Sequence, residues 1–176
     1  PQPPALHMAL DEVLLDEVGD WYVCGSFIQT AGFGSTVTSE TVAKAFKQGA
    51  HDTSYRCQIM GIINPVNFPS RPMGNAMFPQ PDGTFVVIGS FKEYGFTTTD
   101  RGYAHIDRNG SPATPPSAWA TTNVPADTRF AQALPDGRFL AHSLNPSAAN
   151  ARYFPDGMVD SSFSTPTTVV NRFMPD

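Results

Sequence analysis

Two aspartates that recur at matching places in the chain are the first residues whose type and spacing could support chemistry. Asp52 and Asp160 each follow a glycine by three residues. Their carboxylates could bind a cation, but calcium and magnesium sites need about six oxygen ligands, and the sequence has no Asp-x-Asp-x-Asp-Gly run. We therefore interpret both as scaffold residues that accept hydrogen bonds from turn amides or pair with the bases Lys44 and Arg152.

Residues for nucleophilic or acid–base catalysis do not form a recognisable set. The histidines are scattered, at positions 7, 51, 105 and 142, and no Gly-x-Ser-x-Gly segment marks a nucleophile elbow. The densest group of carboxylates, Asp11, Glu12, Asp16 and Glu17, could serve a glycosidase that uses paired carboxylates. We interpret it instead as solubilising surface charge. We expect no catalytic residue, no metal and no cofactor, and we expect that the protein is not an enzyme.

Charge and cysteine usage limit the classes of partner and of metal site that the sequence predicts. The formal net charge is −5, and residues 1–20 carry five acids and no base, so the rest of the chain is neutral. Without a basic patch we expect no nucleic-acid binding, and without an apolar run of about 20 residues we expect no membrane insertion. Cys24 and Cys57 lack the spacing of a zinc site. We interpret them as two buried thiols, with a disulfide in an oxidising compartment as the alternative.

The elements that position these residues are predicted by composition and by repeats. Of 176 residues, 17 are Pro and 14 are Gly, and only 15% are charged, which favours many short strands joined by turns. One motif occurs at 42–55, 103–111 and 150–163, with its glycines 61 and 47 residues apart. The first and third copies align without a gap, whereas in the second Ala113 stands where the aspartate is expected. Another motif precedes each copy, at 19–27, 83–91 and 137–144.

The second copy shows how each motif folds. Residues 75–78, 85–88 and 103–106 are short apolar runs typical of strands. Asp82-Gly83 and Asn109-Gly110 are turn signals, in which glycine supplies the positive φ at little cost. We therefore expect two hairpins, and so a four-stranded sheet, in every copy. A lone sheet of this size cannot bury both faces, so the copies must stack around an axis.

A family resemblance follows from these segments. Pro-Asp-Gly-Arg-Phe-Leu at 135–140 and the segment 150–163 resemble the delta-sixty β-propeller repeat, whose halves read DGK-hydrophobic-GGxF and ARLNxDGSLDxxF. The resemblance covers about residues 5–163. The sequence departs from the repeat at two places: it has Val18-Gly19 in place of Asp-Gly, and the second copy lacks the aspartate. It implies an all-β fold, a β-propeller fragment of about three four-stranded antiparallel blades, and more about fold than about activity.

The organisation expected from the copies has blade-like repeats separated by connecting segments. The repeats are 1–57, 73–113 and 128–163, the connections are 58–72 and 114–127, and a truncated fourth repeat begins at 164–176. The last of these is inferred because 169–176 resembles 127–136. Since rings close with four to eight blades, we expect a fragment, or a chain whose remaining blades come from the same or another chain.

Two segments also fit a helical pattern. Leu6, Leu10, Val13, Leu14 and Val18 recur at a helical period, and for this segment helix and strand stay open. Residues 38–46 read locally as a capped helix. There the gap-free match of 42–55 to 150–163 leads us to predict a strand.

The candidate ligand-binding residues are aromatics in the long connections, where loops of a rigid scaffold usually bind. They are Trp119, Tyr94, Phe96 and Phe33. They could stack on a surface glycan or dock another assembly subunit; alternatively they fill gaps between blades. Delta-sixty repeats occur in bacterial secreted or surface proteins and in phage proteins. Because the chain has repeats, low charge and no catalytic constellation, we expect a non-catalytic structural or recognition module of a secreted, cell-surface or virion assembly, such as a phage tail or fibre. The alternatives are a carbohydrate-active enzyme domain and a purely structural subunit.

Overall fold

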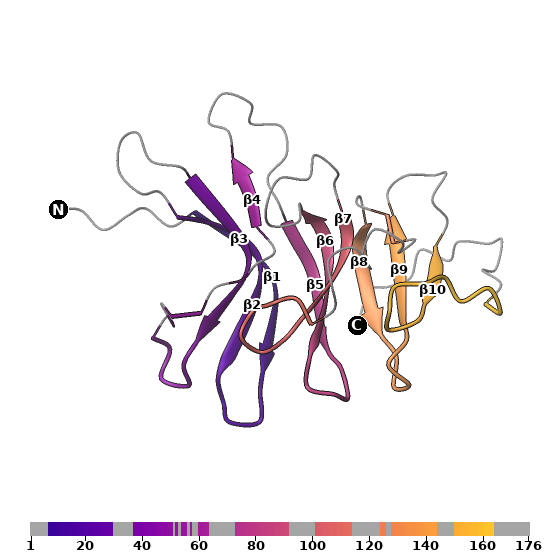
Figure 1. Ribbon diagram of the computed structural model, residues 1–176, viewed down its shortest axis with the longest axis horizontal. Helices are drawn as coiled ribbons and strands as arrows, with labels where there is room; N and C mark the ends of the chain where they lie inside the picture. Colours follow the sequence, from indigo (N-terminus) through magenta and orange to yellow (C-terminus); the bar gives the residue numbers. More distant parts are fainter. Residues whose placement is uncertain are drawn as a thin grey trace, which may run out of the picture.

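The chain folds into β-strands joined by tight turns. The computed structural model describes residues 7–29, 37–50, 52, 54–55, 57, 60–63, 73–91, 101–113, 124–125, 128–143 and 150–163. Every regular element in these ranges is a strand, and the strands form three separate antiparallel sheets (Figure 1). The predicted all-β class is confirmed. Within the same ranges, no helix has the length and apolar character needed to cross a membrane.

The three sheets follow one another along the chain. Sheet 1 has the order β1 (His7–Leu15), β2 (Trp21–Gln29), β3 (Val37–Ala45), β4 (Met60–Ile63). Sheet 2 has the order β5 (Met73–Pro79), β6 (Phe85–Phe91), β7 (Arg101–Ile106). Sheet 3 has β8 (Thr128–Ala133), β9 (Phe139–Ser143) and β10 (Ala151–Tyr153), with β9 central. After β7 and β10 the described chain forms single bridges, Ile106 to Pro112 and Tyr153 to Val159. A fourth strand in sheets 2 and 3 therefore stays a prediction.

One turn geometry recurs six times in the described part of the chain, twice for each sheet. In the first turn, Asp16 N–H donates to Asp20 O at 2.9 Å, and Gly19 N–H donates back to Asp16 O at 3.0 Å. The same pair of bonds recurs five more times, as expected of a three-residue loop that ends in a left-handed residue. The residues with positive φ are the predicted glycines 19, 49, 83, 110, 137 and 157, with φ between 81° and 90°. The predicted turns are thus confirmed.

Both segments with a helical pattern are strands. Residues 7–15 form β1, in which Leu14 lies opposite Tyr22 and Leu15 opposite Trp21 of β2. Gly19 therefore ends a β-turn and does not cap a helix. Residues 37–45 form β3, which confirms the strand predicted from the repeat. Pairing with β2 on one side satisfies backbone groups that a helix would satisfy internally, and tertiary packing overrides the local propensity.

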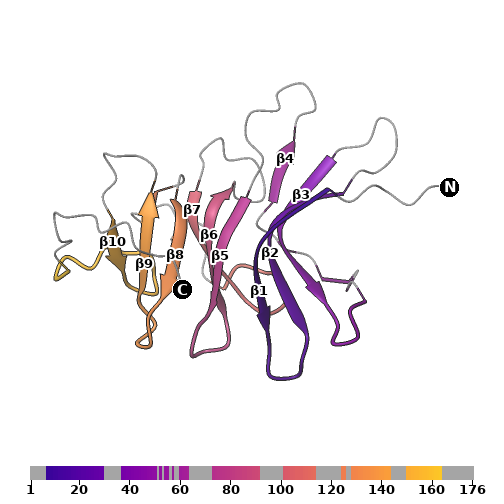
Figure 2. The ribbon, with the colours of Figure 1, turned by 180° about the vertical axis from the view of Figure 1, so that it is seen from behind.

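The sheets stack face to face in chain order, with sheet 2 in the middle (Figures 1 and 2). Tyr22 of sheet 1 packs on Phe85 of sheet 2, with ring centroids 4.8 Å apart. On the opposite face of sheet 2, Phe78 and Tyr103 contact Phe139 of sheet 3, with centroids at 5.6 and 6.4 Å. The core therefore consists of two aromatic layers, one on each face of the middle sheet.

The first strand of each sheet carries a bulge, and in sheets 1 and 2 a side chain at the bulge contacts the next sheet. The register shifts fall at the same place, between Leu10 and Glu12 in β1 and between Gly74 and Ala76 in β5. Glu12 Oε2 accepts from Met77 N–H at 2.6 Å, and Asn75 Nδ2 donates to the Thr128 carbonyl at 2.5 Å. Burial raises the pKa of Glu12, and the bond from Met77 opposes that rise. These side chains satisfy edge groups of β5 and β8 that would otherwise pair with another strand.

Both cysteines are buried as thiols. Cys57 Sγ lies 3.6 Å from Thr41 Oγ1, and Cys24 packs where sheet 2 approaches sheet 1, close to Gly74. Burial raises the pKa of the Cys24 thiol well above its ordinary value. The interpretation as two buried thiols is confirmed, and a thiol with a raised pKa is a poor nucleophile at neutral pH.

Candidate functional site

Each sheet carries a polar cluster at the same place, beside its turns. The clusters are defined by three corresponding positions: one directly after the first turn glycine, one in the third strand, and one after the second turn. Cluster 1 is Asp20, Lys44 and Asp52; cluster 2 is Thr84, His105 and Ala113; cluster 3 is Arg138, Arg152 and Asp160. The register places the second positions alike, because Tyr22, Val86 and Leu140 lie opposite Lys44, His105 and Arg152.

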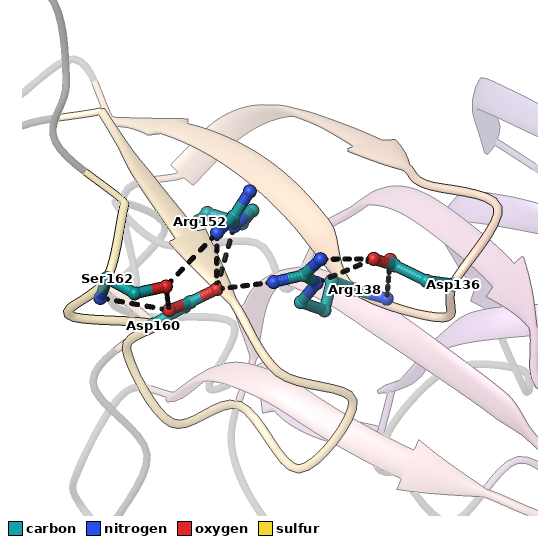
Figure 3. Close-up of polar contacts among 5 residues, drawn as sticks. All are labelled: Asp136, Arg138, Arg152, Asp160 and Ser162. Atoms are coloured by element: carbon teal, nitrogen blue, oxygen red, sulfur yellow. Dashed lines mark hydrogen bonds and ion pairs between the residues drawn. The ribbon is translucent and has the colours of Figure 1, made fainter.

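Cluster 3 is the most extensive of the three (Figure 3). Asp160 Oδ2 accepts hydrogen bonds from Arg138 Nη1 and Arg152 Nε, each at 2.8 Å. Its Oδ1 accepts from Ser162 N–H at 3.0 Å and from the Ser162 hydroxyl at 2.5 Å. Arg138 also binds Asp136 through Nε at 2.8 Å. Asp160 is buried, whereas both arginines keep part of their side chains in solvent. A buried carboxylate in the turn after β10 thus joins β10 to the turn before β9.

The electrostatics of cluster 3 favour the charged carboxylate. The Ser162 hydroxyl, followed by the Arg138 and Arg152 guanidinium groups, holds the pKa of Asp160 far below its ordinary value of 3.8. Hydrogen bonds from Arg138 likewise lower the pKa of Asp136. Hydrogen bonds to the ionised form favour it over the protonated form. Such a carboxylate is a poor general acid and base at neutral pH.

In cluster 1 the residue directly after the turn glycine is an acid, Asp20, where cluster 3 has the base Arg138. Lys44 Nζ lies 3.0 Å from Asp20 Oδ2 and 5.4 Å from the centre of the Tyr22 ring. Asp52 accepts from Ser54 N–H at 2.9 Å and from the Ser54 hydroxyl at 2.5 Å, and the hydroxyl bond is the main reason that the pKa of Asp52 is lowered. The aspartate after the second turn thus keeps the same serine contact in clusters 1 and 3.

Cluster 2 contains a hydroxyl, an imidazole and a nearby carboxylate. Thr84 Oγ1 donates to Asp82 Oδ1 at 2.5 Å and hydrogen-bonds His105 Nε2. The single hydroxyl proton goes to the carboxylate, so Thr84 accepts from Nε2–H. Burial lowers the pKa of His105, which keeps the ring neutral near pH 7. An activated nucleophile needs the reverse order, with the hydroxyl donating to the imidazole and the carboxylate orienting it.

The backbone holds the second turn whether or not the aspartate is present. Asp52 N–H donates to Lys44 O at 2.9 Å, and Asp160 N–H donates to Arg152 O at 2.8 Å. Ala113 N–H makes the equivalent bond to His105 O at 2.8 Å. Both aspartates add serine contacts to a turn that is already formed, and Asp160 adds ion pairs with two arginines. Both aspartates accept hydrogen bonds from turn amides, as predicted, and the predicted pairing of Asp160 with Arg152 is confirmed.

Arg138 is the member of cluster 3 that the sequence pattern does not reveal as a partner of Asp160. The two lie 22 residues apart, and their ion pair joins the turn directly before β9 to the turn after β10. An available signal is the base directly after Gly137, two residues before Leu140, which lies opposite Arg152 once the two strands pair. Among the described residues, no group of three His, Cys, Asp or Glu side chains is placed to hold a metal ion.

The predicted ligand-binding aromatics are not placed. Trp119, Tyr94, Phe96 and Phe33 all lie outside the described residues, so their role in binding stays a prediction. No protein-family model, curated protein or solved structure matches the chain. The resemblance to delta-sixty repeats stays a prediction as well.

Asp160→Asn is expected to lower the melting temperature at pH 7. Asparagine keeps an acceptor for Ser162 but leaves Arg138 and Arg152 without their shared charge. Because the pKa of Asp160 is lowered on folding, its charge stabilises the protein fully above the ordinary pKa of 3.8, and the contribution is lost as the pH falls below that value. The difference in melting temperature between the parent protein and Asp160→Asn should therefore become smaller from pH 7 to about pH 2.5.

Melting curves by circular dichroism at the two pH values test this. Asp156→Asn is the matched control, because Asp156 is an exposed turn residue of the same sheet that bonds Met158 N–H. We expect that Asp156→Asn lowers the melting temperature at pH 7 less than Asp160→Asn does. A gap for Asp160→Asn that is the same at both pH values would contradict the ionic role of this carboxylate.

Proposed function

We propose that the protein is a non-catalytic β-propeller module that serves as a structural or recognition part of a secreted, cell-surface or virion assembly. The observation that carries the proposal is the stack of three small antiparallel sheets in chain order, with the middle sheet buried on both faces. Propeller blades pack in this way around an axis. In this proposal each copy of the motif is one blade, and residues after the second turn supply the fourth strand of sheets 2 and 3.

The resemblance to delta-sixty repeats supports the same architecture. The segment 135–140 contains a turn glycine followed by a strand, and the segment 150–163 contains β10, a second turn glycine and Asp160. Each element of the motif thus has a structural reason: the glycines accept positive φ, and Asp160 joins the arginines. The proposal therefore rests on the part of the motif that shapes the fold.

Recognition is assigned to the connections between strands and between sheets. Rigid scaffolds commonly present binding residues on such loops, and Trp119, Tyr94, Phe96 and Phe33 supply aromatic rings there. Aromatic rings can stack on sugars or anchor a protein interface. The polar clusters favour binding over turnover, because their carboxylates are engaged with arginine, lysine, serine or threonine groups.

A glycan-binding screen followed by product analysis tests the proposal. We expect that the chain binds a glycan or a partner protein and leaves it chemically unchanged. Trp119→Ala should weaken binding by about tenfold or more, whereas Phe154→Ala, which removes an exposed ring from a turn, should not. Cleavage of a bound glycan would support the carbohydrate-active enzyme instead. Weakened assembly with unchanged ligand binding in Trp119→Ala would support a purely structural subunit.

A further inference from the structure

The two end sheets of the stack have faces that no described sheet covers. We call the face that points to the next sheet the forward face, and the face that points to the preceding sheet the rear face. The forward face of sheet 1 and both faces of sheet 2 are buried, as is the rear face of sheet 3. The rear face of sheet 1 and the forward face of sheet 3 lie at the two ends (Figures 1 and 2).

The rear face of sheet 1 is apolar across three paired strands. One row joins Leu15, Trp21 and Ala45, and a neighbouring row joins Val13, Val23 and Ala43. Leu15 is 63% exposed and Trp21 44% exposed. A contiguous apolar face of this kind on a folded protein marks an interaction surface.

Sheet 2 shows what the same positions do when they are covered. Phe85 corresponds to Trp21 and is 4% exposed, and Met77 corresponds to Val13 and is fully buried. Val87, Ala104 and Ile106 lie in the same two rows and are fully buried as well, whereas Pro79, the counterpart of Leu15, stays exposed. The positions of Trp21, Val13, Val23, Ala43 and Ala45 are therefore those that become core once another sheet lies on this face.

The two internal interfaces show which surface covers a rear face. In both, the forward face of the preceding sheet supplies an aromatic layer and a tyrosine hydroxyl. Tyr22 donates to the Arg108 carbonyl at 3.2 Å, and Tyr103 donates to the Pro155 carbonyl at 2.6 Å. The two tyrosines come from different strands, yet the two carbonyls occupy the same place in the second turn of the next sheet. The docking geometry is thus maintained while its side chains differ.

The described forward face of sheet 3 offers an aromatic ring but no tyrosine hydroxyl, and it carries Phe130, His142, Leu140, Gln132 and Arg152. Phe130 is 68% exposed and contacts His142, with ring centroids 6.2 Å apart. Leu140 and Gln132 lie beside each other on the same face. Phe130 thus offers an aromatic anchor on this face, in the place taken by Glu12 and Ala76 in the other sheets.

We propose that the rear face of sheet 1 docks the forward face of sheet 3 from a second copy of this chain, as a third interface of the kind that joins sheets 1, 2 and 3. The proposal rests on the propeller architecture given above. Each copy carries both faces, so the contact is head-to-tail.

Variants that each disrupt one of the two faces test the docking. Trp21→Glu disrupts the rear face of sheet 1, and Phe130→Glu disrupts the forward face of sheet 3. By sedimentation velocity over a range of concentrations, we expect that the parent chain associates and that each variant alone has a dissociation constant raised about tenfold or more. Val18→Glu is the control, because Val18 is 68% exposed in the β1–β2 turn and belongs to neither face. Circular dichroism checks that all variants are folded.

Mixing the two variants distinguishes head-to-tail docking from other association. Trp21→Glu keeps a sound forward face and Phe130→Glu keeps a sound rear face, so an equimolar mixture should form a mixed dimer through one interface. A parent chain that remains monomeric, or a Phe130→Glu variant that still self-associates through two rear faces, would overturn the proposal. A monomer that binds glycan without turnover would leave the proposed function intact, whereas an assembled chain that cleaves glycan would leave the docking intact.

Discussion

Gly102→Ala is expected to lower the free energy of unfolding by about 3 kcal/mol, at the upper end of overpacking costs. A Cβ atom at this position would lie 2.3 Å from the Pro125 carbonyl oxygen and 2.5 Å from that of Val124. Both contacts are to backbone atoms, which cannot rotate away as a flexible side chain can. The connection before sheet 3 would have to move off β7.

The control for this prediction is the same substitution where space is open. Gly49 has φ +86°, and a Cβ atom added there would have no heavy atom within 4 Å, so Gly49→Ala should cost only the left-handed backbone penalty of about 1–2 kcal/mol. Urea unfolding followed by circular dichroism measures both. A smaller loss for Gly102→Ala than for Gly49→Ala would show that the segment at Pro125 does not lie against β7.

Phe139→Ala is expected to lower the free energy of unfolding by about 3–5 kcal/mol, as for other buried phenylalanines. Phe139 is fully buried between sheets 2 and 3. Its ring contacts Tyr153, Phe78 and Tyr103, with centroids at 5.3, 5.6 and 6.4 Å. Alanine would leave a cavity bounded by three rings that are themselves held in strands, so the site could collapse only in part.

Trp21→Ala is the matched control, because Trp21 occupies the corresponding position in sheet 1. It is 44% exposed, and its removal should cost less than about 1 kcal/mol in dilute solution. Urea unfolding at low protein concentration compares the two without the contribution of association. Equal losses for the two variants would contradict the burial of one aromatic position and the exposure of the other.

The local elements of the fold could be predicted because their causes are local. Positive φ at Gly83 and Gly110 follows from the turn signals Asp-Gly and Asn-Gly. Gly19 and Gly49 lie in turns of the same geometry, although a valine and a glutamine precede them in place of aspartate or asparagine. There the repeat, and not the dipeptide, carried the prediction. The strand at 37–45 likewise needed the comparison between copies, because its residues alone read as a helix.

The candidate site was predictable only in part. The pairing of Asp160 with Arg152 follows from positions eight residues apart on one hairpin, whereas Arg138 reaches Asp160 across neighbouring strands. The contact of Glu12 with Met77 joins two sheets through a bulge. Bulges and contacts between sheets depend on how the strands pair and how the sheets stack. The spacing of residues along the chain does not predict that arrangement.

The sequence by itself determined the all-β class, the turn glycines, the short strands and the turn contacts of two aspartates, because turn geometry and strand periodicity arise from neighbouring residues. Tertiary structure decided which apolar side chains form the core. Trp21, Phe85 and Phe139 follow corresponding turn glycines by two residues, yet one is exposed and two are buried. The physical reason is that burial depends on whether another sheet lies against that face, and this is set by the place of each sheet in the stack.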